Sequence, residues 1–266
     1  MSDHSSPDKE VPFTLDGRAV VARPGETVLG VAKRNGVRIP TLCHHDAVTP
    51  YGSCRLCVVE AIWGRRSKIV TACLYQPWEG DVIETNNARV RRTRAMVIEL
   101  LWSRHPDVPA LADLAREYGV ERTRFTPGGT AEYERCILCG LCVRVCSEVV
   151  GASALGYSGR GLGRAVGTPF GDQSEECVGC GACVFVCPTG ALHYEDTDGL
   201  RTMKEFNTQT PLLKCRTCGE TFATEKQIAR VRERLSLPAE LAETCPRCRG
   251  TQHRRAMEKV LVTKRS

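Results

Sequence analysis

Sixteen cysteines in a chain of 266 residues constrain its possible folds more than any other sequence feature. They fall into tight groups, and the first ten residues are polar, without the apolar segment of a secretion signal. Thiols of a chain that lacks an export signal stay reduced, which favours thiolate-metal bonds over disulfides. We therefore expect a cytoplasmic protein that is organised by metal sites. No segment is apolar over enough residues to predict direct membrane insertion.

The charge of the chain gives little support to a nucleic-acid partner. Its formal value is +6, but this sum treats every cysteine as a neutral thiol. Metal-bound thiolates would lower the sum, and the lysines and arginines are scattered rather than gathered with aromatic residues. Aromatic residues make up 6% of the chain, so large hydrophobic cores are not expected. We expect no binding of nucleic acid.

The segment around the first cysteine group is predicted to fold as a small α+β unit. Asp16-Gly17 favours a tight turn that joins the first two strands into a hairpin. Helical spacing follows before the first cysteine, and more strands follow after it. The expected elements are strands over residues 11–15, 18–22, 58–62, 69–72 and 81–85 and a helix over residues 27–35.

The first cysteine group has the spacing C-x10-C-x2-C-x15-C. We call it the first set, and it consists of Cys43, Cys54, Cys57 and Cys73. Four thiolates suit a 2Fe-2S cluster, because the long loop can wrap the cluster while its backbone N–H groups bond the sulfurs. The spacing differs from that of plant-type ferredoxins. A structural zinc site is the alternative, although zinc seldom needs so long a loop between ligands.

The pattern C-x2-C-x2-C-x3-C occurs twice, which is typical of ferredoxins with two 4Fe-4S clusters. In that pattern three closely spaced thiolates hold one cluster, and the fourth cysteine of the run binds the other cluster. The crossed assignment gives a second set of Cys136, Cys139, Cys142 and Cys187 and a third set of Cys177, Cys180, Cys183 and Cys146. Cys187 precedes a proline, as the pattern expects, whereas Cys146 precedes Ser147.

The tail set contains two C-x2-C pairs, formed by Cys215, Cys218, Cys245 and Cys248. Two such tight turns supply four thiolates for a tetrahedral structural zinc ion. The sequence thus predicts a zinc-ribbon-like unit, with a helix over residues 224–235 between the pairs. A rubredoxin-like iron, another iron-sulfur cluster and redox-active thiols are the alternatives. We expect His253 to face solvent, because four sulfurs complete the set.

The segment between the first and second sets is predicted to be a helical connector, with helices at 88–105 and 109–118 and a linker at 126–129. The first helix has an apolar face with Val90, Ala95, Val97, Leu100 and Leu101. Its arginines are expected to form a solvated face: Arg89, Arg91, Arg92 and Arg94.

A glycine-rich segment at 159–163 lies between the two cysteine runs. Its pattern G-x-G-x-G misses the dinucleotide fingerprint, so we expect a loop rather than a nucleotide site. A phosphate-binding G-x-x-x-x-G-K-[ST] pattern is also missing from the sequence, so no NAD or flavin site is expected. The chain is therefore expected to borrow its substrate site from another subunit.

Residues 11–195 resemble the large iron-sulfur subunit of respiratory complex I and the diaphorase subunits of soluble NAD-linked hydrogenases and formate dehydrogenases. The resemblance implies a β-grasp fold for the first domain. It rests on the segments Ile-Pro-Thr-Leu-Cys at 39–43, Gly-Ser-Cys-Arg-Leu-Cys at 52–57, Glu-Leu-Leu-Trp-Ser-Arg-His-Pro at 99–106, Gly-Arg-Gly at 159–161, Gly-Thr-Pro-Phe at 167–170 and Cys-Pro-Thr-Gly-Ala-Leu at 187–192.

In these relatives the pattern H-x3-C-x2-C-x5-C holds an additional 4Fe-4S cluster after the helix that ends in His-Pro. Counting that spacing from His105 reaches Pro109, Ala112 and Tyr118, and none of them is a thiol. We therefore expect this cluster to be missing. His105 is then interpreted as a relic, a surface histidine or a partner contact.

The resemblance implies a non-catalytic electron-transfer subunit of an NAD(P)-linked oxidoreductase complex. The cysteine spacings predict its cofactors, which are one 2Fe-2S cluster, two 4Fe-4S clusters and one zinc ion. Its implied partners are an NAD(P)H-oxidising flavoprotein with FMN and a second redox catalytic subunit, such as a hydrogenase, a formate dehydrogenase or another reductase. The expected domains are a 2Fe-2S β-grasp domain at 11–86, the helical connector at 87–125, a two-cluster 4Fe-4S ferredoxin domain at 126–200 and the zinc-ribbon-like tail at 201–266.

Two other functions compete with electron transfer. A catalytic FeFe hydrogenase has a similar N-terminal region, but the residues after Cys187 leave no room for a catalytic domain. A redox-sensing regulatory protein could use the tail to bind nucleic acid or protein. Three clusters exceed what sensing requires, and salt-dependent DNA binding by the isolated protein would discriminate that function.

Overall fold

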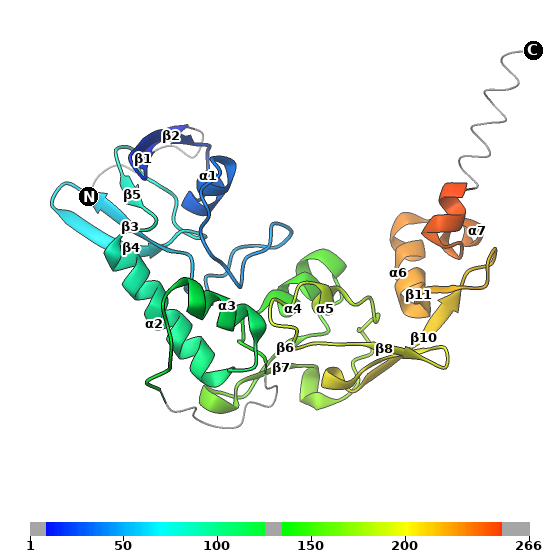
Figure 1. The fold of residues 1–266 in the computed structure, drawn as a ribbon. Coiled ribbons are helices and arrows are strands. Elements are labelled where there is room, and N and C mark those ends of the chain that lie inside the picture. Colours follow the sequence, from blue (N-terminus) through cyan, green and yellow to red (C-terminus); the bar gives the residue numbers. More distant parts are fainter. Residues whose placement is uncertain (1–8, 126–134, 252–266) are drawn as a thin grey trace, which may run out of the picture.

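The computed structural model describes residues 9–125 and 135–251. The cysteine sets follow one another through the molecule in the order of the sequence (Figure 1). An N-terminal sheet and two helices lie at one end, the repeated cysteine runs lie in the middle, and the tail set lies at the other end. No helix within the described ranges is long and apolar enough to cross a membrane. The expected linker at 126–129 and His253 lie outside the described residues.

The first sheet is mixed and has the order β2-β1-β5-β3-β4. Strands β1 and β5 pair in parallel, whereas the other neighbours are antiparallel. Asp16 and Gly17, with φ of 47° and 76°, form the tight turn expected between β1 and β2, since positive φ suits such a turn. The strands are β1 (Val11–Leu15), β2 (Arg18–Ala22), β3 (Val58–Trp63), β4 (Arg66–Thr71) and β5 (Val82–Glu84). All five occur where the sequence predicts strands.

Helix α1 (Val28–Arg34) packs on this sheet because its apolar spacing directs one face inward. Thr27 begins the helix, and its side-chain oxygen accepts a hydrogen bond from Gly30 N at 3.3 Å. The helix and the sheet share one core, whose members include Phe13, Leu15, Val28, Val31 and Ile83.

Helices α2 (Ala88–Arg104) and α3 (Pro109–Glu117) form the expected connector. Two details of the prediction for α2 are wrong. Leu100, expected on the apolar face, is 47% exposed, and Arg94, expected on the solvated face, is 1% exposed. Arg94 lies four residues from both Val90 and Ile98, so helical geometry places it on the buried stripe.

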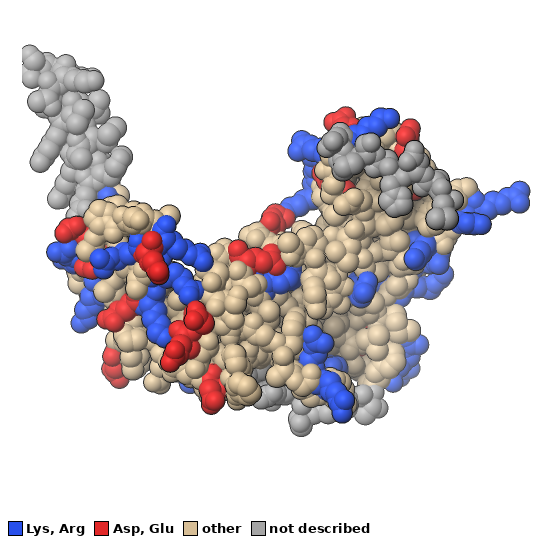
Figure 2. Space-filling model, turned by 180° about the vertical axis from the view of Figure 1, so that it is seen from behind, with Lys and Arg blue, Asp and Glu red and all other residues tan. Residues whose placement is uncertain are grey.

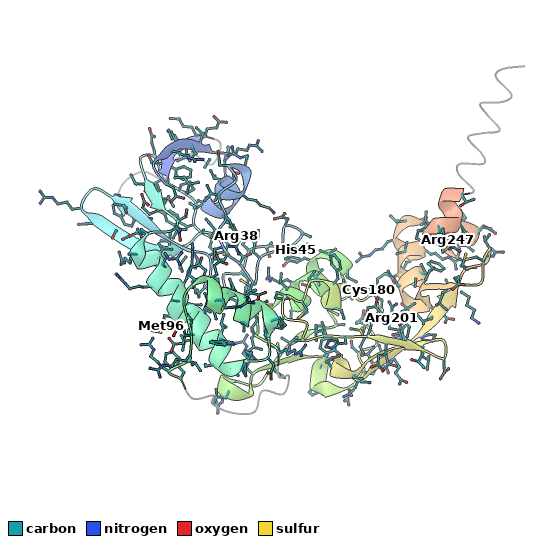
Figure 3. All side chains as sticks on the ribbon, viewed as in Figure 1. Arg38, His45, Met96, Cys180, Arg201 and Arg247 are labelled. Carbon is teal, nitrogen blue, oxygen red and sulfur yellow. The ribbon has the colours of Figure 1, made fainter. Side chains whose placement is uncertain are left out.

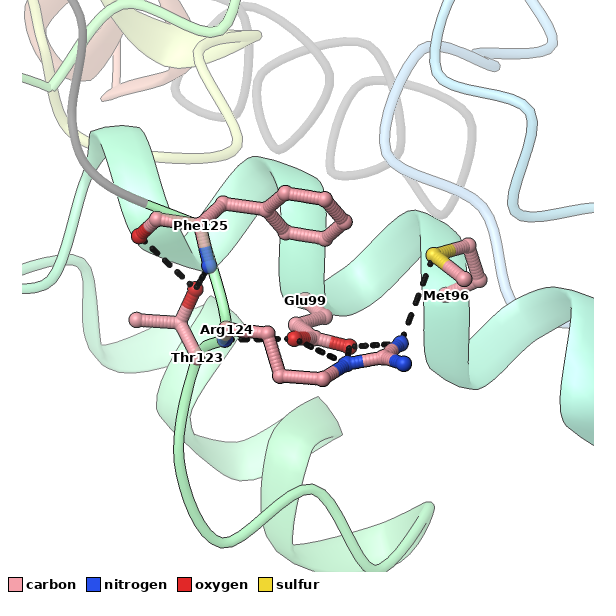
Figure 4. A network of polar contacts seen from close by, with 5 residues as sticks. All are labelled: Met96, Glu99, Thr123, Arg124 and Phe125. Carbon is pink, nitrogen blue, oxygen red and sulfur yellow. Dashed lines mark hydrogen bonds and ion pairs between the residues drawn. The ribbon is translucent and has the colours of Figure 1, made fainter.

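Glu99 fixes the segment that follows α3 to helix α2 (Figure 4). Its carboxylate accepts hydrogen bonds from the backbone N of Arg124 at 2.6 Å and from Arg124 Nη2 at 2.8 Å. The Arg124 guanidinium holds the pKa of Glu99 below its usual range. The buried carboxylate is therefore paired, as burial of a charge requires.

The two cysteine runs form similar local structures, which confirms the internal repeat. Helices α4 (Leu141–Arg144) and α5 (Ala182–Phe185) each begin after a glycine with positive φ, Gly140 at 72° and Gly181 at 76°. A Cβ on Gly140 would lie 2.2 Å from Tyr157 Oη, so the close approach also requires glycine. The other elements between the runs are η1 (Val145–Val150), a π-helical segment, the hairpin β6 (Gly156–Ser158) and β7 (Ala165–Gly167), and the 3₁₀ turns η2 (Gly161–Gly163) and η3 (Pro169–Gly171). The glycine-rich segment forms the loop of the β6–β7 hairpin, as expected.

A second antiparallel sheet, with the order β11-β10-β9-β8, leads into the tail. It runs across the domain boundary expected at residue 200, because β8 lies before that residue, β9 begins at it and the other strands follow it. The predicted helix at 224–235 is present as α6. The elements are β8 (Glu195–Thr197), β9 (Leu200–Met203), the 3₁₀ turn η4 (Lys204–Phe206), β10 (Thr208–Lys214), β11 (Thr221–Thr224), α6 (Glu225–Leu235) and α7 (Ala239–Ala242).

One hydrophobic cluster joins the loop of the first set to the connector and to the repeated runs. Leu56 from that loop, Ile98 of α2 and Leu111 of α3 are all 0% exposed within it. Leu141 of α4 and Val186 also belong to this cluster. The connector therefore packs against the segments on both sides of it and holds them in one arrangement.

We expect Leu111→Ala to lower the free energy of unfolding by about 2–5 kcal/mol, because the lost side chain leaves a cavity in this shared cluster. Leu100→Ala is the matched control, since Leu100 is 47% exposed and should change stability little. Denaturant titration of the metal-loaded protein measures both variants. Equal, small effects would show that the cluster does not hold the units together.

Candidate metal centres

The first set lies between helix α1 and the end of the β3–β4 hairpin. Cys43 and Cys54 come from the loop after α1, Cys57 directly precedes β3, and Cys73 follows β4. The four residues are between 1% and 6% exposed. The pairing of β3 with β4 brings the last two cysteines together, since Ala72 N donates to Cys57 O at 2.9 Å.

Backbone donors already point at the sulfurs of the first set. Cys54 N lies 3.4 Å from Cys43 Sγ, and Leu42 N lies 3.4 Å from Cys54 Sγ. A hydrogen bond with Cys54 lowers the pKa of Cys43 to about 6 and raises the pKa of Cys54. The pairing with Cys73 lowers the pKa of Cys57 to about 7 in the same way. Each pair thus favours one thiolate, the metal-binding form of cysteine, and keeps its partner as the thiol that donates to it.

Two buried arginines hold the loop of the first set from opposite elements. Arg94 of α2 donates to Leu56 O at 3.1 Å and to Val58 O at 2.7 Å, the carbonyl groups on either side of Cys57. Arg144 of α4 donates to Cys43 O at 2.8 Å. Sequence reasoning missed both residues. The position of Arg94 on the Val90–Ile98 stripe is the signal that could have identified it.

The two repeated runs enclose two separate cavities, and each cavity is lined by cysteines of both runs. One cavity is lined by the four cysteines of the second set. The other is lined by the four cysteines of the third set. The fold therefore brings together the cysteines that the crossed pattern groups.

Burial raises the pKa of several thiols in these two sets. It raises the pKa of Cys139 and Cys142 to about 12 and also raises the pKa of Cys183. Backbone donors reach the fourth cysteine of each run, since Ala154 N lies 3.3 Å from Cys146 Sγ and Ala191 N lies 3.3 Å from Cys187 Sγ. Such dry thiols need a cation to become thiolates, so metal binding there releases protons.

The first and second sets are joined by direct polar contacts. Ser53 Oγ, next to Cys54 in the chain, donates to the carbonyl oxygen of Leu138 at 3.2 Å, and Leu138 directly precedes Cys139. A second contact links the same segments, since Thr49 N donates to Glu148 Oε2 at 2.7 Å. These bonds fix the loop of the first set against the second set.

A third arginine lies beside the third set (Figure 3). Arg201 of β9 donates to Gly179 O at 3.0 Å, directly before Cys180 in the chain. Its charge is paired with Asp196, whose Oδ2 lies 2.8 Å from Nη2. The guanidinium is also 4.0 Å from the ring centre of Tyr194. Arg201 therefore supports the backbone of this set without leaving an unpaired charge.

The tail set has the geometry of a site for a single ion. One sulfur from each of its four cysteines lies within 4.8 Å of the others, and no second group of His, Cys, Asp or Glu in the described ranges gathers its ligand atoms in this way. A tetrahedral ion with metal-sulfur bonds of about 2.3 Å requires such close sulfurs. A backbone hydrogen bond from Cys245 lowers the pKa of Cys215 to about 6, whereas the contact with Cys245 raises the pKa of Cys248 to about 12.

His105 ends helix α2 and is 2% exposed. The interpretation of it as a surface histidine is therefore wrong, because the C-terminus of α2 is buried. Its backbone lies in the turn between α2 and α3, where Val108 N donates to His105 O at 3.3 Å. No cysteine follows it before Cys136.

Comparisons with known proteins agree with this arrangement of sites. Residues 8–88 match the model of the 2Fe-2S iron-sulfur cluster binding domain. Residues 135–191 and 170–222 match two models of a 4Fe-4S dicluster domain. Fold and sites thus define an iron-sulfur protein in which a 2Fe-2S domain precedes 4Fe-4S ferredoxin-like domains.

Similar proteins include a subunit of the NADH-quinone oxidoreductase of Rhizobium meliloti (strain 1021), 37% identical over 68% of this chain and 24% of its own length. The mitochondrial 78 kDa subunit of NADH-ubiquinone oxidoreductase of Candida albicans is 32% identical over 60% of this chain and 25% of its own length. The chain spans about a quarter of the length of these relatives.

A chain in the crystal structure of the H2-reduced NAD+-reducing [NiFe]-hydrogenase is also similar. It is 32% identical, with a TM-score of 0.52 over 59% of this chain and 74% of that chain. The protein belongs to the iron-sulfur family that these relatives share, in which a 2Fe-2S domain is followed by 4Fe-4S dicluster domains.

We expect the purified protein to hold about one tetrahedral thiolate-bound ion at the tail set, beyond the iron of its clusters. Cys245→Ser should remove this ion and leave the spectra of the clusters unchanged. Cys73→Ser is the matched control, because it should damage the first set and keep the tail ion. Elemental analysis with X-ray absorption at the metal edge measures both, and retention of the ion in Cys245→Ser would contradict the site.

Proposed function

We propose that this protein relays single electrons through one 2Fe-2S cluster at the first set and two 4Fe-4S clusters at the second and third sets. The tail set holds one structural zinc ion, which makes the C-terminal segment a zinc ribbon. The first sheet, with α1 packed against it, serves as a β-grasp support for the 2Fe-2S cluster. We also propose the four domains at 11–86, 87–125, 126–200 and 201–266. The sheet formed by β8 to β11 joins the 4Fe-4S domain to the tail.

The two cysteine-lined cavities carry this proposal. Each is lined by three cysteines of one run and the fourth cysteine of the other run, which is the ligand sharing of two-cluster ferredoxins. Their linings are almost wholly apolar apart from the sulfurs and backbone, so a cluster there would be dry. Burial and sulfur hydrogen bonds are two of the features by which a protein sets cluster potentials.

The contacts between the first and second sets supply a short route for electrons. From Cys54 the route runs through the adjacent Ser53, across one hydrogen bond to Leu138 O, and on to the adjacent Cys139. The iron-sulfur clusters supply one-electron chemistry when bound, and no acid, base or nucleophile of the chain is required. The residues named here act by fixing the distance between the two sites.

The partners that fit this relay are an FMN-containing flavoprotein that oxidises NAD(P)H and a second redox catalytic subunit. The names of the relatives specify NADH oxidation or NAD+ reduction. This chain contains no dinucleotide or phosphate-binding glycine pattern, so another subunit has to bind the nucleotide. A hydrogenase, a formate dehydrogenase or another reductase fits the far end. The reduced thiols favour a cytoplasmic setting.

Cys187→Ala tests the crossed ligand sets. We expect iron to fall from about ten to about six atoms per chain, because the cluster of the second set loses its fourth ligand. Cys146→Ala is the matched variant and should remove the other 4Fe-4S cluster. Iron analysis and EPR of the reduced, anaerobically purified protein measure both. Loss of the third-set cluster in Cys187→Ala would reverse the assignment.

A reconstitution experiment tests the electron relay. The isolated protein should not be reduced by NADH or NADPH, whereas dithionite should reduce its clusters. Addition of the purified flavoprotein partner should make cluster reduction by the nucleotide rapid, followed by absorbance and EPR. Nucleotide-dependent reduction without any partner would refute the proposed division of labour, and no reduction with the partner would refute the relay.

A further inference from the structure

Arg94 is the largest fully buried side chain of the described residues, with 1% exposure. Its guanidinium donates to two carbonyl groups and, through Nη1, to Tyr118 Oη at 3.0 Å. Within the described ranges, no carboxylate oxygen lies within 4.0 Å of its nitrogen atoms, since it takes part in none of the ion pairs. Each of its three nitrogen atoms therefore has an acceptor, but no carboxylate compensates its positive charge.

The lack of an ion pair distinguishes Arg94 from two other arginines in this part of the molecule. Arg89 and Arg124 pair with Glu60 and Glu99 on or beside the same helix. A buried charge is costly unless a counter-charge lies nearby, and an arginine stays protonated at any ordinary pH. The environment of Arg94 therefore requires an anion that the side chains around it do not supply.

The first set supplies that anion. Arg94 donates hydrogen bonds to the carbonyl groups of Leu56 and Val58, the two residues that flank Cys57. Its charge therefore lies beside the backbone of Cys57, a proposed cluster ligand. Four thiolates around a 2Fe-2S core leave the centre with a net negative charge. Helix α2 thus places a buried, fixed cation next to the backbone of the loop that would hold the anionic centre.

We propose that Arg94 is the counter-charge of the 2Fe-2S cluster and raises its reduction potential. One electron added to the cluster adds one negative charge, and a fixed positive charge stabilises the reduced state more than the oxidised state. This inference rests on the proposed function, since it assumes the cluster at the first set. Arg94 is a positioning residue, because its contacts are with the loop and not with the cluster itself.

Potentials measured on the full-length, anaerobically purified protein test this role. Arg94→Gln removes the charge and keeps a donor, Arg94→Lys keeps the charge, and Arg92→Gln removes an exposed charge from the same helix. We expect Arg94→Gln to lower the reduced-to-oxidised ratio of the 2Fe-2S cluster roughly tenfold at a fixed potential, a shift of about 59 mV. Arg94→Lys and Arg92→Gln should keep the wild-type potential, and the 4Fe-4S potentials should not move.

The outcomes distinguish an effect of the Arg94 charge on the potential from a purely structural role of Arg94. An unchanged 2Fe-2S potential in Arg94→Gln, or an equal shift in Arg92→Gln, overturns the proposal. If Arg94→Gln binds no 2Fe-2S cluster, Arg94→Lys decides: a bound cluster with the wild-type potential supports the proposal, and a lost cluster or a shifted potential overturns it. Absence of a 2Fe-2S EPR signal in the wild-type protein would instead refute the proposed function.

Discussion

The N-terminal part of the structure depends on the hydrogen bonds that buried arginines make with the loop of the first set. The loop of the first set contains little regular structure, so its own hydrogen bonds cannot hold it. Arg94 and Arg144 bind its carbonyl groups from two different helices. These hydrogen bonds hold the loop in one conformation. They also place positive charge near cysteine sulfurs that must lose their protons to bind metal.

The same contacts unite segments that the sequence places far apart. Arg144 and Glu148 follow cysteines of the second and third sets, yet both bind the loop of the first set. The shared hydrophobic cluster packs this junction, and its residues come from the loop, the connector and the repeated runs. Electron transfer between centres needs constant distances. Figure 1 shows helices α2 and α3 of the connector between the first sheet and the repeated runs.

The tail is attached to the second cysteine run by direct hydrogen bonds. Thr224, which is fully buried, donates to Val178 O, and Lys226 Nζ donates to Glu175 O at 3.1 Å. Between the tail and the N-terminal units the molecule is hollowed (Figure 2). Because α6 packs beside the third set, a structural ion in the tail would also stabilise the surroundings of that set.

The sequence by itself determined the strands of the first sheet, the helices α1, α2, α3 and α6 and the grouping of the cysteines, because alternation, helical spacing and ligand spacing are local properties. The strands from β6 to β11 were not predicted. The positions of the strands from β1 to β5 and of α6 are confirmed, and the cysteines of each set line one site. The ligands of each cluster stay a prediction. Tertiary structure decided which carbonyl groups Arg94 contacts, the burial of His105 and the bridge from Ser53 to Leu138. The apolar stripe of α2 places Arg94 on the buried face, but the loop that packs there lies far away in the sequence, and no local pattern encodes that contact.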